Sequence, residues 1–393
     1  MSEYLPLVMA TGALMAFALV AKSVSRSFVT APILALFFGC LLASLELAPT
    51  KITQEHLHTV AEVALIMLLF LDAAKTDVPG LIRRHAWPAR ALLFGMPLAF
   101  LGGAVVLFLL LPQSPLPVVL LIAAILVPTD AALGQSVVQS DAVPERLRRA
   151  IVVESGLNDG IALPAVLMFA AFAAVSAEAP PMGWPLYGLM QITVGPLVGA
   201  ALGYAAGRAF LVAQEKGTTS ERYEGIAVLG LAFFAYFLAT MLGGNGFIAA
   251  FVCGIGFGWI VGDRCSFIFE FTENEGQLLS WSAFFLIGAL LVPDAIAALD
   301  GAMLAAILLS LLVVRPLAIA LSLIGTDADV KARLFIGWFG PRGLATALFA
   351  MLVAEHLDTE VADYVLHFAT NAVWISALLH GVSTGPFIKA LKA

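Results

Sequence analysis

Long apolar stretches, broken at intervals by charged or Gly/Pro-rich segments, run through the whole chain. An apolar run of about 20 residues is long enough to cross a bilayer as a helix. The pattern predicts thirteen such helices joined by short connections. The predicted spans are 5–21, 29–48, 57–75, 88–111, 115–139, 147–176, 185–212, 223–242, 245–262, 277–292, 299–324, 332–354 and 362–386. We therefore expect an all-α polytopic membrane protein.

Composition supports this interpretation and removes most others. Of the 393 residues, 61% are hydrophobic and 12% are charged, whereas soluble domains are about 45–50% apolar and about 25% charged. These values exclude a soluble enzyme, a disordered chain and a nucleic-acid-binding protein. Cys40, Cys253 and Cys265 form no CxxC pair and lie in or beside apolar runs, so we expect neither a disulfide framework nor a zinc site.

The basic residues predict an orientation. If the N-terminus lies outside, 17 of the 20 Lys and Arg residues fall in inside loops, and only Lys51 falls in an outside loop. Cytoplasmic loops of membrane proteins carry the excess of Lys and Arg. The sequence thus predicts a multi-pass protein of the plasma membrane, or of the inner membrane of a bacterial cell, with its N-terminus outside and its C-terminus in the cytoplasm.

Five charged residues fall near the middle of predicted spans: Asp130, Glu154, Asp159, Arg315 and Arg342. Each such charge costs about 2.5–3.5 kcal/mol on insertion scales. Intramembrane ion pairs can serve only to hold helices together, but three acids against two arginines leave one negative charge. An unbalanced buried carboxylate must take up a proton or hold a cation. That competition is what a cation/proton exchanger needs.

Two predicted spans are interrupted beside these charges. Val-Pro-Thr-Asp breaks the fifth span at 127–130, and Gly-Pro-Arg-Gly breaks the twelfth at 340–343. A proline kink alone would explain either break, but secondary transporters also build ion sites from such broken helices. The seven-span offset between the breaks inverts their orientation. Spans 1–6 and 8–13 can therefore form two inverted six-helix repeats.

The sixth span presents oxygen atoms on one face. Ser155 and Asp159 are four residues apart and stack on the same side of a helix, and Glu154 and Asn158 form the neighbouring pair. Asp159 lies about 18 Å from the start of this span at about 1.5 Å per residue. A hydroxyl and a carboxylate at that depth suit a hard cation.

Three motifs resemble those of the NhaP/NHE-type monovalent cation/proton antiporters. They are Pro-Thr-Asp at 128–130, Glu-Ser-Gly-Leu-Asn-Asp at 154–159 and Gly-Pro-Arg-Gly at 340–343. The resemblance implies an NhaA-like antiporter fold, with about 13 transmembrane helices in two inverted six-helix repeats and crossed discontinuous helices. It also implies a homodimer. The moving core would comprise 88–178 and 297–393, the scaffold and dimerisation spans 1–87 and 221–296, and the linker 179–220.

The same resemblance implies roles for individual residues. Asp159 would be the principal cation and proton carboxylate, and the Na⁺ coordination would be completed by Asp130, Ser155 and the Thr129 main-chain carbonyl. Glu154 would form an ion bridge to an arginine, Arg315 in preference to Arg342, with Asn158 supporting it. Asp72 would either assist ion access or anchor the interface. His380 is expected to be a packed, hydrogen-bonded histidine.

We therefore expect an electroneutral 1:1 exchange of Na⁺ or Li⁺ for H⁺ by alternating access, which would serve pH homeostasis. The Asn158–Asp159 pair resembles the electroneutral branch. No cofactor is expected; the partners would be monovalent cations, protons, membrane lipid and a second copy of the chain, and not nucleic acid. A K⁺/H⁺ exchanger on the same fold is the main alternative. A passive channel, and an intramembrane hydrolase using Ser155 with His380, are more distant ones.

Overall fold

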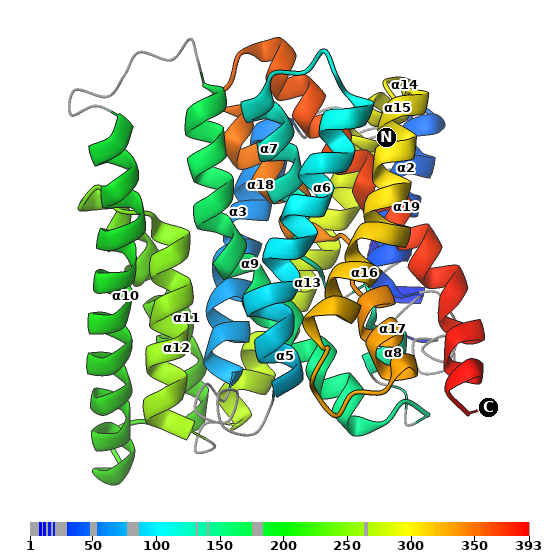
Figure 1. The fold of residues 1–393 in the computed structure, drawn as a ribbon. Helices are drawn as coiled ribbons and strands as arrows, with labels where there is room; N and C mark the ends of the chain where they lie inside the picture. Colours follow the sequence, from blue (N-terminus) through cyan, green and yellow to red (C-terminus); the bar gives the residue numbers. More distant parts are fainter. Residues whose placement is uncertain are drawn as a thin grey trace.

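Helices form the regular secondary structure of the part of the chain that the computed structural model describes (Figure 1). The described residues are 30–47, 53–76, 86–130, 133–138, 140, 142–174, 184–262 and 266–392, with 8–9, 11–12, 15–16 and 19. Most of the predicted first span, 5–21, lies outside them. Within the described ranges there is no strand. An all-α architecture is thereby confirmed.

Each predicted span from the second to the thirteenth overlaps between one and three observed helical elements. In chain order these are α2 (Ala31–Ser44), α3 (Gln54–Lys75), α5 (Ala86–Arg90), η1 (Ala91–Gly95), α6 (Met96–Leu110), α7 (Leu116–Ile125), α8 (Gln135–Val138), α9 (Glu145–Ala173), α10 (Trp184–Glu215), α11 (Glu221–Met241), α12 (Gly246–Val261), α13 (Ser266–Leu290), α14 (Val292–Ala297), α15 (Gly301–Leu309), η3 (Ser310–Val314), α16 (Arg315–Ser322), α17 (Val330–Trp338), α18 (Leu344–Ala354) and α19 (Thr359–Lys392).

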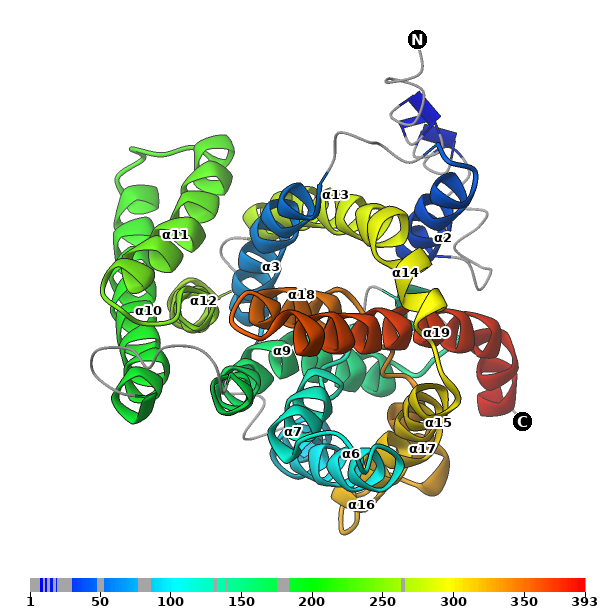
Figure 2. The ribbon, with the colours of Figure 1, turned by 90° about the horizontal axis from the view of Figure 1, so that it is seen from above.

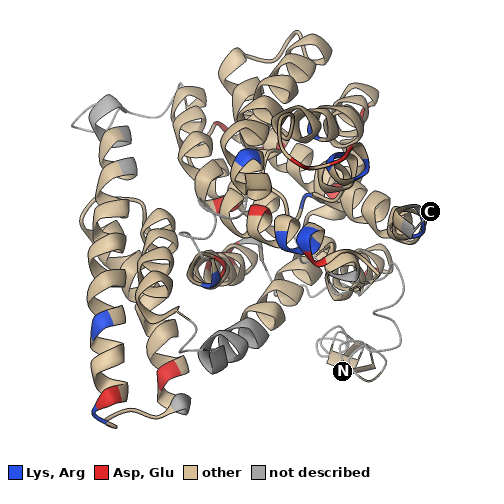
Figure 3. Ribbon diagram, turned by 60° about the horizontal axis from the view of Figure 1, so that its bottom comes forward, with Lys and Arg blue, Asp and Glu red and all other residues tan. Residues whose placement is uncertain are grey.

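Among the described residues, seven helical segments are long and apolar enough to cross a membrane, and five apolar helices are shorter. Ribbon segments coloured for Lys, Arg, Asp or Glu are sparse (Figure 3). Several helices run a few residues beyond their predicted ranges, and two run further: α13 begins at Ser266 and α19 continues to Lys392. Hydropathy locates the edge of the bilayer, whereas a helix continues into the polar region as long as its backbone bonds persist. The chain is a multi-pass membrane protein.

Two short π-helical turns were not predicted. The first, η1, precedes Pro97 at the start of α6, and the second, η3, precedes Pro316 at the start of α16. Proline lacks an N–H group and its ring crowds the carbonyl four residues earlier, so a wider turn relieves the clash. α16 packs against η1, and α6 packs against η3. The two distorted segments therefore lie together in the bundle.

Seen from above, the helices form distinct groups (Figure 2). α10, α11 and α12 lie together at one side, and α6, α7, α9, α15, α16 and α17 form a second group. α18 and α19 run between that second group and the helices α2, α3 and α13. α9 also contacts α3, α12 and α18. The segment that carries Ser155 and Asp159 is thus central to the bundle.

The closest packing in the first group joins α10 to α12. Glycines recur every fourth residue along α10, at 195, 199, 203 and 207, a spacing that lets two helix backbones approach closely. A Cβ atom at Gly199 would lie 3.0 Å from the Cys253 amide nitrogen and closer still to the Ala249 carbonyl oxygen. The position therefore has no room for a side chain.

Gly199→Ala is expected to lower stability by about 1–3 kcal/mol, because the added methyl group overpacks the contact with the α12 backbone. Gly230→Ala in α11 is the matched control, since a Cβ there would meet nothing within 4 Å. Removing a helical glycine without a clash should stabilise that helix slightly. Thermal unfolding of both variants in detergent checks this. Equal melting temperatures for the two would contradict the packing.

Candidate functional site

The breaks of the two interrupted spans are in contact. α7 ends at Ile125 and α8 begins at Gln135, while α17 ends at Trp338 and α18 begins at Leu344. The Asp130 backbone N–H donates to the Pro341 carbonyl oxygen at 2.8 Å. The two non-helical segments therefore lie side by side.

Arg342 satisfies backbone carbonyl groups at both breaks. Its Nη1 lies 3.3 Å from the Val127 oxygen, 3.4 Å from the Pro128 oxygen and 3.3 Å from the Gly340 oxygen. The side chain is buried. These carbonyls follow the C-terminal ends of α7 and α17, where a helix carries partial negative charge. The guanidinium thus compensates two half-helix ends that are buried in the bundle.

Asp130 performs the complementary task at the start of α18. Its Oδ2 accepts a hydrogen bond from the Leu344 backbone N–H at 2.9 Å. A carboxylate is stabilised at a helix N-terminus because unpaired amide groups and the helix dipole present positive charge there. This contact was not predicted, because the sequence pointed to Asp130 only as a cation ligand.

The glycines of Gly-Pro-Arg-Gly leave space for charged side chains. A Cβ at Gly340 would overlap the Arg315 guanidinium, and a Cβ at Gly343 would overlap the Asp130 carboxyl group. Any larger residue would displace one of these groups. The motif therefore requires glycine on both sides of Pro341 and Arg342 for a steric reason that the sequence did not reveal.

Glu154 forms a buried ion pair with Arg315 and not with Arg342. Arg315 Nη2 lies 2.9 Å from Glu154 Oε2, and Nη1 lies 3.3 Å from Oε1. Both side chains are almost fully buried. Asn158 Nδ2 donates to Glu154 Oε1 at 3.3 Å and to Thr129 Oγ1 at 2.6 Å. Asn158 thereby links the ion pair to the break in the fifth span.

Ser155 and Asp159 lie on the neighbouring face of α9. The Ser155 hydroxyl donates to the Thr129 main-chain oxygen at 2.7 Å. Oδ1 of Asp159 is buried and has no hydrogen-bond partner among the described residues. The carboxylates of Asp130, Glu154 and Asp72 all lie close enough to repel that of Asp159. A buried carboxylate oxygen without a donor requires a proton or a cation.

Asp72 lies beside this group. A Cβ added at Gly156 of α9 would be 3.2 Å from Asp72 Cβ. A small pocket lies beside Ser155, with Ile151, Val137 and Phe339 in its wall. Its other lining residues are Thr129, Asp130, Gly134, Ser155, Gly340 and Pro341. In the described part of the chain, no three His, Cys, Asp or Glu side chains converge as a metal centre requires.

His380 lies apart from Ser155. Its Nε2 is 2.8 Å from the Trp338 carbonyl oxygen, and its Nδ1 is 2.8 Å from the Ser376 carbonyl oxygen. Both ring nitrogens are therefore engaged, and the Ser155–His380 dyad of the hydrolase alternative is absent from this geometry. The histidine is packed and hydrogen-bonded, as expected.

Two contributors to the site were not identified from the sequence. The Ser376 hydroxyl accepts a hydrogen bond from the Arg342 backbone N–H at 2.8 Å, and the Leu344 amide binds Asp130. Neither has a recognisable motif, because a backbone amide has no side-chain signature and a serine within an apolar helix is common. The sequence signal that could have pointed to them is the Gly-Pro-Arg-Gly motif at 340–343, which contains Arg342 and directly precedes Leu344.

Half-helices that end inside an apolar bundle, facing buried charges, are the construction of a secondary transporter. Family comparison agrees with this class. The family model described as "Sodium/hydrogen exchanger, transmembrane" matches residues 12–390. The chain belongs to that family.

Individual relatives are distant but extend along the chain. The "K(+)/H(+) antiporter NhaP" of Alkalimonas amylolytica is 28% identical and covers 98% of this chain and 67% of its own length. The "Na(+)/H(+) antiporter NhaH" of Halobacillus dabanensis is 27% identical over 89% of this chain and 88% of its own. The solved sodium proton antiporter MjNhaP1 of Methanocaldococcus jannaschii shares the fold, with a TM-score of 0.77, 19% identity and 99% of each chain covered.

Glu154→Gln is expected to destabilise the protein by about 3–5 kcal/mol, because Arg315 would remain buried without its countercharge. Glu145→Gln is the control, since Glu145 pairs with Arg149 at the surface. Thermal unfolding separates the two variants. The charge-swapped Glu154→Arg/Arg315→Glu protein should recover part of the loss, and a stable Glu154→Gln protein with only a changed cation affinity would place Glu154 in the ion site instead.

Proposed function

We propose that this protein exchanges Na⁺ or Li⁺ for H⁺ by alternating access, with Asp159 as the carboxylate that takes either ion. The observation that carries the proposal is the buried Asp159 Oδ1 without a hydrogen-bond partner in the described residues. In an apolar bundle such an oxygen is stabilised only by a cation or a proton. Competition of the two for one site couples their transport.

The Na⁺ ligands would be Asp159, Asp130, the Ser155 hydroxyl and the Thr129 main-chain oxygen. Support comes from the Ser155–Thr129 hydrogen bond, which brings two of these oxygens within 2.7 Å of each other. Carboxylate, hydroxyl and carbonyl oxygens are the ligands that hard cations prefer. Glu154 would not take part in exchange, because Arg315 already balances its charge.

Access from the cytoplasm is supported by the position of the pocket. Its lining includes both Ser155 and Ile151, and Ile151 lies one helical turn nearer the N-terminus of α9. That terminus carries Arg146, Arg148 and Arg149, and basic residues concentrate on the cytoplasmic side. The N-terminus of the chain would then lie outside and its C-terminus in the cytoplasm of a bacterial inner membrane or a plasma membrane.

The inverted repeat and the domain division belong to the same proposal. The fourth and eleventh predicted spans each contain a π-helical turn before a proline, and the fifth and twelfth are both broken. Such pairs seven spans apart support two inverted six-helix repeats among thirteen helices. Core segments 88–178 and 297–393 would move against scaffold segments 1–87 and 221–296, joined by 179–220, in a homodimer.

K⁺/H⁺ exchange is the second candidate. Relatives of similar identity carry the names K⁺/H⁺ antiporter and Na⁺/H⁺ antiporter. Na⁺ and K⁺ bind the same oxygen ligands and differ in the size of the cage that suits them. Proteoliposomes under an imposed pH gradient, with Na⁺, Li⁺ and K⁺ added separately, would distinguish them: Na⁺ and Li⁺ should collapse the gradient and K⁺ should not.

Asp159→Asn is expected to abolish exchange while leaving the protein folded, because an amide neither binds a proton at neutral pH nor supplies a negative charge. Gradient-driven cation flux in proteoliposomes measures the activity, and thermal unfolding verifies the fold. Asp363→Asn, at an exposed position of α19, should retain normal flux. Near-normal transport by folded Asp159→Asn protein would reject the role of Asp159.

Exchange is expected to be 1:1 and insensitive to membrane voltage. Asp130, Glu154 and Asp159 against Arg315 and Arg342 leave one negative charge, which is neutralised equally by one cation or one proton. Asn158, in place of a second titratable acid, supports the same stoichiometry. Reversal potentials in vesicles test it, with Asp72→Asn as a companion variant. A voltage-dependent reversal potential would refute it, and loss of that dependence in Asp72→Asn would assign a second proton to Asp72.

A further inference from the structure

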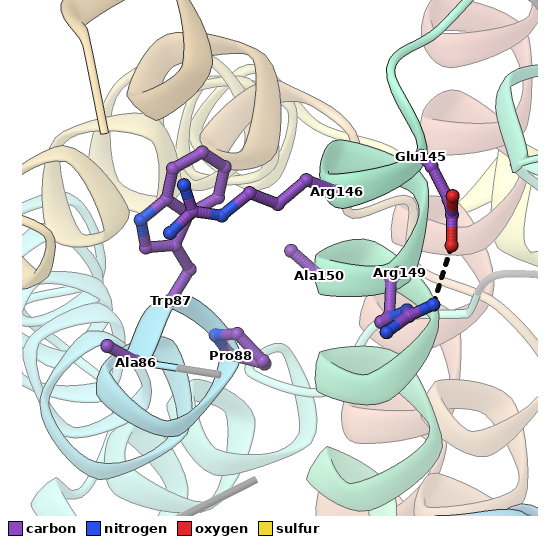
Figure 4. A pocket seen from close by; sticks show the side chains of 7 residues that line it. All are labelled: Ala86, Trp87, Pro88, Glu145, Arg146, Arg149 and Ala150. Atoms are coloured by element: carbon purple, nitrogen blue, oxygen red, sulfur yellow. Dashed lines mark hydrogen bonds and ion pairs between the residues drawn. The ribbon is translucent and has the colours of Figure 1, made fainter. Parts of the chain in front are cut away.

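A second pocket lies away from the carboxylate site, between α5 and the first turns of α9. Its volume is about 380 Å³, within the size range of small-molecule sites. Figure 4 shows Trp87 and Pro88 of α5 facing Arg146, Arg149 and Ala150 of α9. Two guanidinium groups and an indole ring therefore border one cavity, and the proposed exchange reaction uses none of them.

Arg146 forms a fixed wall of this pocket. Its guanidinium carbon lies 3.9 Å from the centre of the Trp87 ring. Its two terminal nitrogens donate to Asp327 at 2.6 and 2.8 Å, and Trp87 Nε1 donates to the same carboxylate at 2.9 Å. These hydrogen bonds hold the pKa of Asp327 below its usual value. Asp327 is therefore ionised at neutral pH, and Arg146 is held in place before any ligand arrives.

Arg149 is available to a ligand. More than half of its side chain is exposed, and Nη2 donates to Glu145 at 2.6 Å. An exposed pair of this i,i+4 type contributes only about 0.3–0.5 kcal/mol. A guanidinium has five donor hydrogens and binds phosphate oxygens in a bidentate manner. If Arg149 gave up its contact with Glu145 for a phosphate, the loss of free energy would therefore be small. The bidentate hydrogen bonds to the phosphate would be stronger than the bond that was lost.

The depth of the pocket matches the lipid headgroups. Arg149 precedes Asp159 by ten residues of α9, which is about 15 Å at about 1.5 Å per residue. The hydrocarbon layer is about 30 Å thick, so with Asp159 near its middle Arg149 lies at its edge. Tryptophan is enriched at that level. This step rests on the proposed membrane position of Asp159 and not on its transport role.

Exposed apolar side chains follow the pocket-lining residues along both helices. Val152, one turn above Arg149 on α9, is exposed, as are Leu93 and Phe94, which follow α5. A soluble anion would gain nothing from these surfaces, whereas acyl chains would cover them. Arg90, Arg146 and Arg149 against Glu145 and Asp327 leave a net positive charge around the cavity. The favoured ligand is thus negatively charged at one end and apolar at the other.

We propose that this pocket binds the phosphate group of an anionic glycerophospholipid. Arg149 would bind the phosphate oxygens, and Arg146 on Trp87 would supply a fixed positive wall. The acyl chains would lie against Val152 and Phe94. Bound lipid would tie the start of α9 to α5 and would stabilise the folded protein in proportion to its occupancy.

The test measures thermal unfolding of the full chain in mild detergent while phosphatidylglycerol is added. The melting temperature should rise with phosphatidylglycerol, and should rise much less with phosphatidylcholine or with inorganic phosphate. Arg149→Gln should need about tenfold or more phosphatidylglycerol for the half-maximal rise, because it loses hydrogen bonds to a charged group. Native mass spectrometry should show that Arg149→Gln retains one lipid fewer per chain than the unaltered protein does.

Arg208→Gln is the matched control, since Arg208 is exposed on α10 and lies near a single aromatic ring, Tyr204. Its lipid response should equal that of the unaltered protein. Equal losses in both variants would mean nonspecific attraction and overturn the proposal, and so would an equal response to inorganic phosphate or phosphatidylcholine. Asp159→Asn should keep the full lipid response, so failure of the exchange proposal and failure of this one are distinguishable.

Discussion

Backbone groups that end inside an apolar bundle have no water to bond, and this constraint organises the centre of the molecule. Two helices stop there, so carbonyl groups at Val127, Pro128 and Gly340 need donors and the Leu344 amide needs an acceptor. Arg342 supplies the donors, and Asp130 supplies the acceptor. A positive and a negative side chain thereby stabilise the ends of broken helices that would otherwise be unfavourable in the membrane.

Glu154 and Asp159, the two acids that α9 brings to the site, differ in the partners that they bond. Glu154 is matched by Arg315 and steadied by Asn158, so its negative charge is already compensated. A buried ion pair of this kind adds little net stability but is strongly destabilising when one partner is lost. Asp159 has an oxygen that no described group bonds. This difference in partners, more than the identity of the acids, is the reason that we propose Asp159 as the group for exchange.

Close backbone packing makes these contacts possible. Gly340 and Gly343 leave the volume that Arg315 and Asp130 occupy, and Gly156 lets Asp72 approach α9. At the end where α9 begins, Trp87, Arg146 and Asp327 tie α5, α9 and the connection between α16 and α17 to one another. The helix that carries Asp159 is therefore held at its start by a polar cluster and at its middle by hydrogen bonds to Thr129.

The sequence by itself determined the helices and the places where they break. Apolar runs must form helices in hydrocarbon because each backbone group needs a partner within its own segment. Pro128 and Pro341 beside Asp130 and Arg342 therefore revealed both breaks, and the spacing of Ser155 and Asp159 predicted their shared face. The helix limits at Ser266 and Lys392 were not predicted, because hydropathy indicates which residues lie within the bilayer and not where helical hydrogen bonding begins or ends.

Only the tertiary structure decided which charges meet. Arg315 and Arg342 are equivalent as charges, and Glu154 is 161 residues from its partner, so the choice depended on how α16 packs and on the space left by Gly340. The contact of Asp130 with the Leu344 amide spans 214 residues and involves a backbone group without any side-chain pattern. The sequence does not distinguish Asp327 from other acids in short connections, because Trp87 and Arg146 contact it only in the folded chain. Local spacing encodes helices and their faces, whereas pairing between distant charges requires the packed bundle.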